Sequence, residues 1–419
     1  MNRRMPGGAG WMTAFTLAWL AIWTVQLTPV QLLLPLQLDT TDGDWIAGVV
    51  MSGLVLGVGG LAGVIAGPVA GALSDAAHPR RRRPWALGGV ALSAAGLVAT
   101  GFSTGPWAVG ASWVGVSIGI AVASAAFTAL IADQLPATRR GAASAVVGSS
   151  QAAGIVLGVG LVVLLGLDVA GGYLLLAAVV AAGGAIAAFL LPDPLASSSV
   201  VSAPRSAPRL AALRDRDFSR MLAGRLVTNI GNALGAALFL FFLLHGLDQP
   251  VATAQDNLLL LIVVYTLFVV VASVAVGWWS DRSGDRRSPA VLATVVQAAS
   301  GIVLVAVPTF EATIVAAALM GVGYGTFSTA GLAFATDLLP DPRRPARDLG
   351  IVTVTAALGQ LIGPVLGAGL VALVGGFWLV FAAAAVLSLI GGALTALAGR
   401  PGSRATGAPR SRSRLRAPR

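Results

Sequence analysis

The chain has 419 residues, of which 56% are hydrophobic and only 11% are charged, and its formal net charge is +10. Soluble proteins carry about 25% charged residues, so this composition excludes a soluble globular protein of this length. Mean hydropathy is +0.85 over the whole chain. Because a bilayer-spanning helix needs about 20 mostly apolar residues, the composition predicts a membrane protein with many spans.

The residue types that the chain lacks exclude several kinds of chemistry. All 27 basic residues are Arg, so the Lys of a P-loop ATPase and the Lys amine of a Schiff base are both missing. The chain has no Cys, which excludes disulfides, thiolate ligands and thiolate nucleophiles. Two histidines, His78 and His245, are too few for a His-rich metal cluster. We therefore expect no metal site, no cofactor and no enzyme activity.

Twelve apolar runs follow one another along the chain. Strands cover only about 4–8 residues, and open sheets leave unsatisfied edges in lipid, so we interpret the runs as transmembrane helices. The first run is too long for a signal peptide and lacks a cleavage site, so we expect it to be retained. The predicted helices cover roughly 11–38, 45–74, 85–104, 107–133, 142–166, 172–191, 218–245, 257–280, 289–308, 312–337, 349–373 and 377–398.

The distribution of arginine predicts the orientation in the membrane. If the N-terminus is inside, 26 of the 27 Arg residues fall on the cytoplasmic side, and the remaining one, Arg225, lies in the seventh run. By the positive-inside rule, both termini are cytoplasmic and the protein lies in the cell (inner or plasma) membrane. Topology thus explains the positive charge, and we expect no nucleic-acid binding. The opposite loops carry Asp39, Asp42, Asp44, Asp168, Asp248, Asp256 and Glu311.

A segment rich in Pro, Ser, Ala and Arg, 192–217, separates the first six runs from the last six. Its composition is typical of a flexible linker. The sequence therefore predicts an N-terminal six-helix half over 1–191, this linker, a C-terminal half over 218–398, and a disordered basic cytoplasmic tail over 399–419.

Three landmarks recur in the same order in both sets of runs. The loop after the second and eighth runs reads Gly-x-x-Ser-Asp followed by Arg residues. The fourth and tenth runs end in Asp-x-Leu-Pro, and the fifth and eleventh share Gln-x-x-Gly-x-x-x-Gly-x-Gly. The chain is therefore predicted to be two parallel, pseudo-symmetric six-helix halves. The first copies lie at 71–83, 133–136 and 151–160, and the second copies at 277–287, 337–340 and 360–369.

Two six-helix halves with these loops resemble the major facilitator superfamily over about residues 11–398. The Asp-x-Leu-Pro ends and the Gln/Gly helices are similar to its glycoside–pentoside–hexuronide and sucrose-carrier branches. The resemblance implies an all-α fold with twelve transmembrane helices and a solute site between halves that rock to give alternating access. It also implies a cytoplasmic gate in the repeated loops, formed by Asp75, Arg81, Arg82 and Arg83 and by Asp281, Arg286 and Arg287.

The chain departs from the superfamily pattern at several points. Ala76 follows Asp75, where the common motif has Arg. The fourth helix lacks the buried Arg of proton-driven drug exporters, and a Gly363-Pro364 pair occurs in the eleventh helix instead of the fifth. The second helix lacks the buried Asp residues that bind the cation in melibiose-type members. These departures argue against drug export and against sodium coupling.

Amide and aromatic side chains inside the apolar runs are the candidates for the solute path. A buried amide costs free energy unless it is hydrogen-bonded, so it should face another helix, a cavity or a solute. Hydrogen bonding between helices is the alternative role, and each aromatic residue alone also fits ordinary packing. The candidates are Gln26, Gln151, Asn229, Asn232, Gln360, Trp23, Tyr265 and Tyr324.

Three charged residues are candidates for coupling. Asp133 and Asp337 precede helix-ending prolines, where they either take part in coupling or act as solvated charges. Arg225 lies about 10 Å into its helix at 1.5 Å per residue, where it is either functional or extends toward the cytoplasm. We interpret His245, near the outer end of the seventh run, as an interfacial polar residue rather than a proton carrier.

These observations predict a secondary, ATP-independent transporter of a small organic solute. Amides both donate and accept hydrogen bonds, which favours a sugar or glycoside-like solute. The alternative is an efflux carrier for amphipathic drugs or metabolites. An intramembrane enzyme would need a buried nucleophile or acid–base pair, which the runs lack, and a receptor without transport stays open. The expected partners are the solute, the lipid bilayer and a coupling proton, and the expected functional unit is a monomer.

Overall fold

The computed structural model describes residues 8–39, 43–77, 81–193, 211–339 and 345–399, and this part of the chain is almost wholly helical. The first half comprises α1 (Ala9–Thr28), the π-helical turn η1 (Pro29–Leu33), α2 (Leu34–Leu38), α3 (Trp45–Ala76), α4 (Arg83–Phe102), α5 (Pro106–Gln134), α6 (Ala137–Leu164) and α7 (Val169–Leu190). After a 3-10 turn, η2 (Ala211–Arg214), the second half comprises α8 (Arg216–Ala237), α9 (Phe239–Phe241), the π-helical turn η3 (Phe242–Gly246), α10 (Val251–Ser283), α11 (Arg287–Ala306), α12 (Phe310–Asp337), α13 (Pro345–Val374) and α14 (Trp378–Ala396).

The helices account for twelve membrane spans. Within the described residues, eleven are long and apolar enough to cross a bilayer alone, and α8 with the segment Phe239–Gly246 forms a twelfth span, bent by 42°. The prediction of twelve transmembrane helices is thereby confirmed. Helices α6 and α10 begin at Ala137 and Val251, a few residues before the predicted runs, because hydropathy marks only the apolar part of a helix. Residues 194–210 of the predicted linker and 400–419 of the predicted tail lie outside the described residues.

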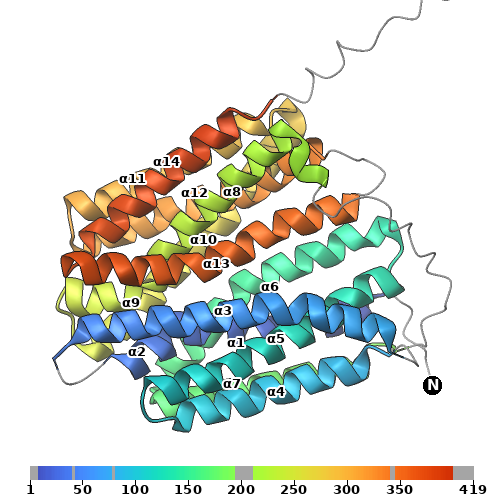
Figure 1. Ribbon diagram of the computed structural model, residues 1–419, viewed down its shortest axis with the longest axis horizontal. Helices are drawn as coiled ribbons and strands as arrows, with labels where there is room; N and C mark the ends of the chain where they lie inside the picture. The colour runs from blue at the N-terminus through green and yellow to red at the C-terminus, as the bar shows by residue number, and fades with distance from the viewer. Residues whose placement is uncertain (1–7, 40–42, 78–80, 194–210, 340–344, 400–419) are drawn as a thin grey trace, which may run out of the picture.

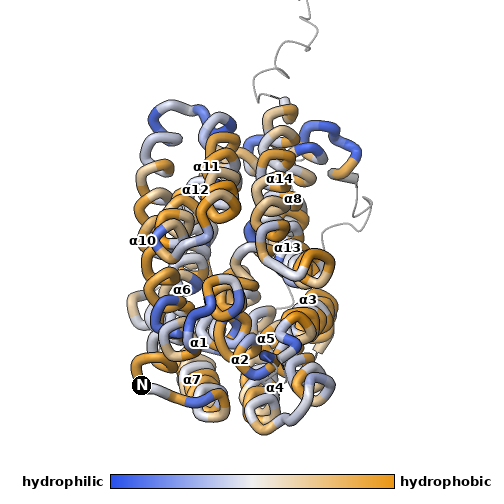
Figure 2. Tube along the Cα trace, turned by 90° about the vertical axis from the view of Figure 1, so that its left-hand side faces the viewer, coloured by the Kyte–Doolittle hydropathy of each residue, from blue (hydrophilic) through white to orange (hydrophobic). Residues whose placement is uncertain are grey.

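Apolar side chains cover the outside of the bundle. On α7, Ile186 and Phe189 are 50% and 63% exposed, and on α14 Val386 is 54% exposed. Hydrophobic residues occur on every labelled helix when the bundle is viewed along its length (Figure 2). Soluble proteins rarely expose large contiguous apolar surfaces, so this surface fits the hydrocarbon of a bilayer.

The two halves are built from matching helix pairs. They lie on either side of the molecule, with α1–α7 in the lower half of Figure 1 and α8–α14 in the upper half. Helix α4 packs on α5 and α7, as α11 packs on α12 and α14. Helix α1 packs on α6 and α7, as α8 packs on α13 and α14, so α1 and α8 are counterparts. The predicted internal repeat therefore corresponds to two six-helix bundles of the same architecture.

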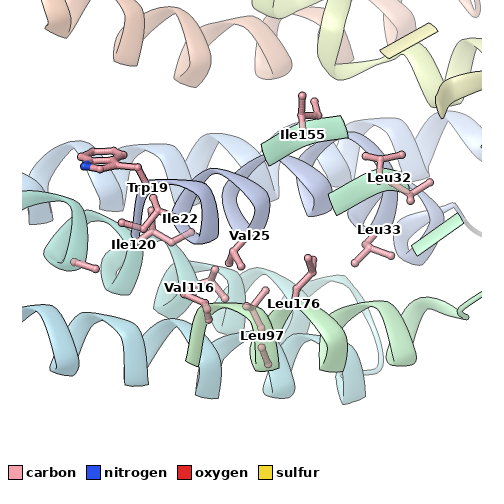
Figure 3. Close-up of a cluster of buried hydrophobic side chains, with 14 of the residues drawn as sticks. Trp19, Ile22, Val25, Leu32, Leu33, Leu97, Val116, Ile120, Ile155 and Leu176 are labelled. Atoms are coloured by element: carbon pink, nitrogen blue, oxygen red, sulfur yellow. The ribbon is translucent and has the colours of Figure 1, made fainter. Parts of the chain in front are cut away.

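The apolar core of the first half surrounds α1. Its residues Trp19, Ile22 and Val25 are buried against Leu97 of α4 and Leu176 of α7 (Figure 3). Burial of such side chains contributes about 1.5–3 kcal/mol each. Because α1 has apolar residues on all sides, it lies inside the bundle rather than at its surface.

The repeated glycines allow close packing at corresponding places. A Cβ on Gly154 of α6 would lie 2.9 Å from the Cβ of Trp23, and a Cβ on Gly363 of α13 would lie 2.7 Å from the Cβ of Ala233. Neither position has room for a side chain. The Gln/Gly pattern therefore packs α6 on α1 and α13 on α8 through small-residue contacts.

The bundle has two chemically distinct ends. We call the end at Arg81–Arg83, Asp193 and Arg286 the Arg-rich end, and the end that carries Asp39, Asp44, Asp168, Asp248 and Glu311 the acidic end. Helix α1 begins at the Arg-rich end, where Trp11 near its start donates to Gln134 near the end of α5 (Figure 1). The π-helical turns η1 and η3 both lie close to the acidic end, just before Asp39 and around His245.

Candidate functional site

The two halves contact each other along two helix pairs, which we call seams. The first seam lies between α3 and α13. A Cβ on Gly53 would lie 2.5 Å from the Cβ of Ala368, and one on Gly60 would lie 3.3 Å from Leu361 Cδ1. Farther along α3, toward the Arg-rich end, a Cβ on Gly67 or Gly71 would meet no atom within 4 Å. The two helices therefore contact each other closely on the acidic side and separate toward the Arg-rich end.

The second seam, between α6 and α10, has the same form. A Cβ on Gly160, near the acidic end of α6, would lie 3.7 Å from Leu259 of α10. On the same face of α6 but closer to the Arg-rich end, Ala153 and Ser149 are exposed. Both seams thus place the contact between the halves at the acidic side.

A polar and aromatic cluster joins the halves at the acidic end. The Nε2 atom of His245 lies 2.9 Å from Oδ1 of Asp39, which follows α2 in the first half. The His245 ring also stacks on Trp45 at 5.0 Å, and Trp45 stacks on Phe377 at 5.4 Å. His245 is therefore not merely an interfacial residue, because it contacts the opposite half through both its nitrogen and its ring face.

At the Arg-rich end, Arg82 is the centre of the first copy of the repeated loop. Its guanidinium binds Asp75 at 2.6 Å and Asp133 at 2.9 Å, and it also donates to Ser74 Oγ. The Arg82 backbone N–H donates to Asp193 Oδ1. Burial opposes the charge, but the hydrogen bonds and charges of Asp133 and Asp75 outweigh it, so the pKa of Arg82 lies above its usual value.

The other basic residues of this loop have different roles. Arg83 donates to the carbonyl oxygens of Ala188 and Leu191 at the end of α7, and its guanidinium lies 5.6 Å from the Phe189 ring centroid. Arg81 is exposed. Three arginines were expected to form the basic side of this gate, but among them only Arg82 contacts Asp75 in the described structure. Arg83 does not, because α4 begins at Arg83 and its side chain extends toward α7.

The second copy of the loop is simpler. Arg286 donates to Asp337 at 2.8 Å, the counterpart of the bond from Arg82 to Asp133. Asp281 is exposed and makes no ion pair with any described residue. Arg287 contributes its backbone N–H, which donates to Asp285 Oδ1 at the start of α11. The ion pairs at the Arg-rich end lie within one half in each case, so in this conformation they do not join the halves.

The polar candidates of α8 lie on one face of the helix. Arg225, Asn229 and Asn232 follow each other at the spacing i, i+4 and i+7, which places them along one stripe. The Nε and Nη1 atoms of Arg225, Nδ2 of Asn229 and Oδ1 of Asn232 are buried without a hydrogen-bond partner. The Arg225 guanidinium lies over the Phe327 ring of α12, 5.2 Å from its centroid.

Two tyrosines complete this group. The rings of Tyr265, from α10, and Tyr324, from α12, lie 6.2 Å apart. The Tyr265 side chain interacts with Asn232, and Tyr324 interacts electrostatically with Arg225. The structure thus brings together five residues that the sequence marked separately. We call the group the Arg225 cluster, and its members are Arg225, Asn229, Asn232, Tyr265, Tyr324 and Phe327.

The remaining candidates are more dispersed. Trp23 of α1 donates from Nε1 to the Val147 carbonyl of α6 at 3.0 Å. Gln26 and Gln151 are half-buried, Gln360 is exposed, and none of them hydrogen-bonds within the described part of the chain. Gln360 lies on the face of α13 opposite the exposed, apolar Ile362.

One buried amide was missed by the sequence reasoning. Gln297 of α11 is 5% exposed, and neither atom of its amide has a hydrogen-bond partner. Together with Asn232 and Ser300 it lines a cavity of about 20 Å³ inside the second half, enough for about one water molecule. A Gln inside the apolar run 289–308 is the signal that could have identified it.

The family of the chain follows from its sequence. The profile described as the major facilitator superfamily matches residues 2–159 and 226–418. The chain belongs to this superfamily. The helical fold with its many membrane spans agrees with this assignment.

Relatives within the superfamily match only part of the chain. The Major facilitator superfamily multidrug transporter mfsC of Aspergillus fumigatus is 27% identical over 141 residues, which is 33% of this chain and 27% of that protein. The Multidrug resistance protein Stp of Mycobacterium tuberculosis is 28% identical over 158 residues, which is 35% of this chain and 28% of that protein. The match therefore spans less than a third of the length of these curated relatives.

Solved structures of the superfamily share the fold over almost the whole chain. A point mutant of the nucleoside transporter NupG superposes with a TM-score of 0.74 and 14% identity, covering 92% of this chain and 98% of that one. A second NupG structure, without the substitution, gives a TM-score of 0.71 and 15% identity over the same shares of both chains. At these identities the likeness establishes the fold and nothing about the solute.

Proposed function

We propose that the protein is a secondary transporter that moves an amphipathic organic solute by alternating access, through a site between the halves at the level of the Arg225 cluster. The observation that carries this proposal is the composition of the cluster. The rings of Tyr265, Tyr324 and Phe327 lie beside one cation and two amides in otherwise apolar helices. Ligand sites of this kind combine aromatic walls with a few polar groups that set orientation.

The seams supply the conformational part of the proposal. The halves touch on the acidic side through Gly53 and Gly160, whereas toward the Arg-rich end Gly67 meets nothing within 4 Å and Ser149 is exposed. A rocking motion that separates Asp39 from His245 and brings the Arg-rich ends together would expose the site to the other side. This requires no ATP and no covalent step.

The Arg-rich end is proposed to face the cytoplasm, because loops with an excess of Arg stay on that side. The described conformation is then open to the cytoplasm, and both termini are cytoplasmic. We place the protein in the cell membrane and take the monomer as the transporting unit, since each chain contains both halves of the path.

Export is the favoured direction. Two relatives that match about a third of the chain carry multidrug names, and an aromatic site suits amphipathic compounds. The sequence features that argued against drug export are the missing Arg and the missing Gly-Pro pair of the fourth and fifth predicted helices, which are α5 and α6. They do not concern the Arg225 cluster, which lies on α8, α10 and α12. A cytoplasm-facing site next to apolar helices would accept such compounds from the cell interior.

Coupling to protons is assigned to carboxylates at the helix ends. Asp133 and Asp337 each accept a hydrogen bond from Arg82 or Arg286. Among the described residues, these two carboxylates pair with Arg at matching places in both halves. We therefore propose that any coupling proton binds at these two carboxylates, and that a double Asn variant retains facilitated flux but cannot accumulate solute.

The test is solute counterflow in proteoliposomes without ATP. The panel contains 2-naphthoate, 2-naphthamide and ethidium as amphipathic aromatics of different charge, with sucrose and uridine as polar solutes. We expect counterflow of at least one aromatic compound above that of empty liposomes, and none of sucrose or uridine. Counterflow of sucrose or uridine with none of the aromatics would overturn the proposal.

A sugar or glycoside is the second candidate, as in the glycoside–pentoside–hexuronide branch. It is favoured by three amides, Gln26, Gln151 and Gln360, that make no hydrogen bond within the described residues. If a sugar is the solute, Gln151→Ala and Gln360→Ala each weaken its binding by about 1–3 kcal/mol while leaving expression intact. For an amphipathic solute, both variants retain wild-type affinity for the transported aromatic compound.

A further inference from the structure

Arg225 is a partly buried cation, two of whose guanidinium nitrogens are fully buried, and it has no counter-charge among the described residues. Its Nε and Nη1 atoms have no hydrogen-bond partner, and no ion pair to it exists within the described residues. Its side chain contacts the Phe327 ring instead. A charge inside a membrane span is costly and is usually paired or functional, so this residue needs an explanation beyond packing.

Extension toward the Arg-rich end does not explain it. Arg225 lies nine residues after α8 begins at Arg216, about 14 Å along the helix. Its guanidinium lies over Phe327 and beside Gly331, ten and six residues before the end of α12, at about 9–15 Å of depth. The charged group therefore lies inside the span, well short of the interface that a snorkelling side chain would reach.

Helix packing does not explain it either. Helix α1 occupies the corresponding place in the first half and packs on α6 and α7 as α8 packs on α13 and α14. Helix α1 contains no charged side chain, and Gln26 is its single amide. The fold therefore forms this central helix without a charge, and Arg225 is an addition to it.

The surroundings of Arg225 combine hydrogen-bond donors with aromatic rings. Gly331 of α12 lies next to Nη1, and a Cβ there would be only 3.1 Å from that atom. The unpartnered Nδ2 of Asn229 lies one helical turn away on the same face of α8. Tyr324, Tyr265 and Phe327 form an aromatic wall beside the guanidinium. These groups match a carboxylate, sulfonate or phosphate carried on an apolar ring.

We propose that Arg225 binds the anionic group of the transported solute, so that this carrier selects amphipathic organic anions over their neutral and cationic counterparts. The inference rests on the proposed function, because it takes the Arg225 cluster to be part of the solute site. The guanidinium supplies a fork of donors for the oxygens of an anion, and the rings bind the body of the solute.

Binding to the purified full-length protein tests the selectivity. The probes are 2-naphthoate, 2-naphthalenesulfonate and 2-naphthyl phosphate, compared with 2-naphthamide and 2-naphthylmethylammonium, and the readout is quenching of tryptophan fluorescence. We expect at least one anion to bind the wild type about tenfold or more tightly than the amide. Arg225→Gln removes this preference, and Arg225→Lys retains part of it.

A second measurement does not depend on the choice of probe. Replacing an unpaired buried charge with an apolar side chain of similar length should stabilise the ligand-free protein. We expect Arg225→Met to raise the melting temperature in detergent by about 2 °C. Arg220→Met is the matched control, because Arg220 lies on the same helix but donates to the Leu397 carbonyl and lies 3.8 Å from Asp217. It should lower the melting temperature or leave it unchanged.

The outcomes separate this inference from the proposed function. Equal binding of the amide and all three anions, or a lower melting temperature for Arg225→Met, overturns the anion site. In that case counterflow of naphthamide or ethidium by the wild type would leave the transporter proposal standing. If no aromatic compound shows counterflow and sucrose does, both the anion site and the proposed function are overturned.

Discussion

Asp39 and His245, 206 residues apart in the chain, face each other across the two halves with Oδ1 and Nε2 separated by 2.9 Å. The first follows α2 and the second lies within η3, so the pair joins elements that belong to different six-helix bundles. With the stacking of Trp45 on His245 and Phe377, it closes the acidic end in this conformation.

Removing the contact between Asp39 and His245 should increase the fraction of molecules in which the acidic end is open. A partly exposed polar contact of this kind contributes at most about 1 kcal/mol, so Asp39→Asn or His245→Ala should raise the ratio of open to closed molecules by up to about fivefold. The measurement is the distance distribution between spin labels on cysteines introduced at Trp107 and Val251, exposed residues near this end in opposite halves. Asp168→Asn is the control, since Asp168 bonds only Gly171 of its own half.

Arg82 should matter more for stability than its counterpart. Arg82 binds two carboxylates, and its side chain is 11% exposed. Arg286 binds one carboxylate, that of Asp337, and its side chain is 31% exposed. Arg82→Gln deprives Asp75 and Asp133 of this cation and should cost about 1–3 kcal/mol, and Arg286→Gln should cost less. Because the pKa of Arg82 is raised, the stabilisation is present at neutral pH and is lost only as pH rises through that pKa. Thermal unfolding in detergent measures both variants, and an equal loss contradicts the ranking.

Asp75 provides a test of the gate that is separate from stability. Its side chain is 62% exposed, so its ion pair contributes little to folding. Asp75→Asn should therefore reduce transport in proteoliposomes while insertion and melting temperature stay close to wild type. Asp281→Asn should have a weaker effect, because Asp281 is exposed and makes no ion pair with a described residue. Unaltered transport in the double variant rejects the gate.

The seam at Gly53 should not tolerate even one methyl group. A Cβ there would lie 2.5 Å from Ala368 Cβ and 2.9 Å from the Pro364 carbonyl oxygen, and such overpacking costs about 1–3 kcal/mol. Gly53→Ala should lower the melting temperature and weaken closure of the acidic end. Gly88→Ala is the matched control, since its Cβ would meet nothing within 4 Å, and in a helix it should be neutral or stabilising. A Gly53→Ala variant as stable as Gly88→Ala would falsify the close contact.

The orientation can be tested with reporter fusions. Fusions within 192–217 and after Gly399 should report the cytoplasm, and a fusion within 39–44 should report the outside, because the Arg residues of the loops lie on one side. A C-terminal fusion that reports the outside contradicts the proposed topology.

Much of the fold was predictable from hydropathy and the internal repeat, because each span is a long apolar segment and the landmarks recur in order. Arg225, Asn232, Tyr265 and Tyr324 could each be selected as polar or aromatic residues in such a segment. Their proximity could not be predicted, since it depends on how α8, α10 and α12 pack against one another. The contact of Asp39 with His245 was missed for a related reason. It depends on the bend between α8 and α9 and on which end of the molecule is closed.

The π-helical turns give the chain an unusual tolerance of length. A π turn holds one more residue than an α turn in the same stretch of helix. Deleting a single residue from Pro29–Leu33 would let the segment relax to an α-helix, and the residues after it would keep almost the same orientation. Asp39 would then still face His245. A deletion in the regular part of α1 would instead rotate everything after it by about 100° and turn Asp39 away from its partner. The same contrast holds between Phe242–Gly246 and α8 in the second half. Single-residue deletions should therefore disable the carrier less often within these two five-residue windows than in the regular helices beside them.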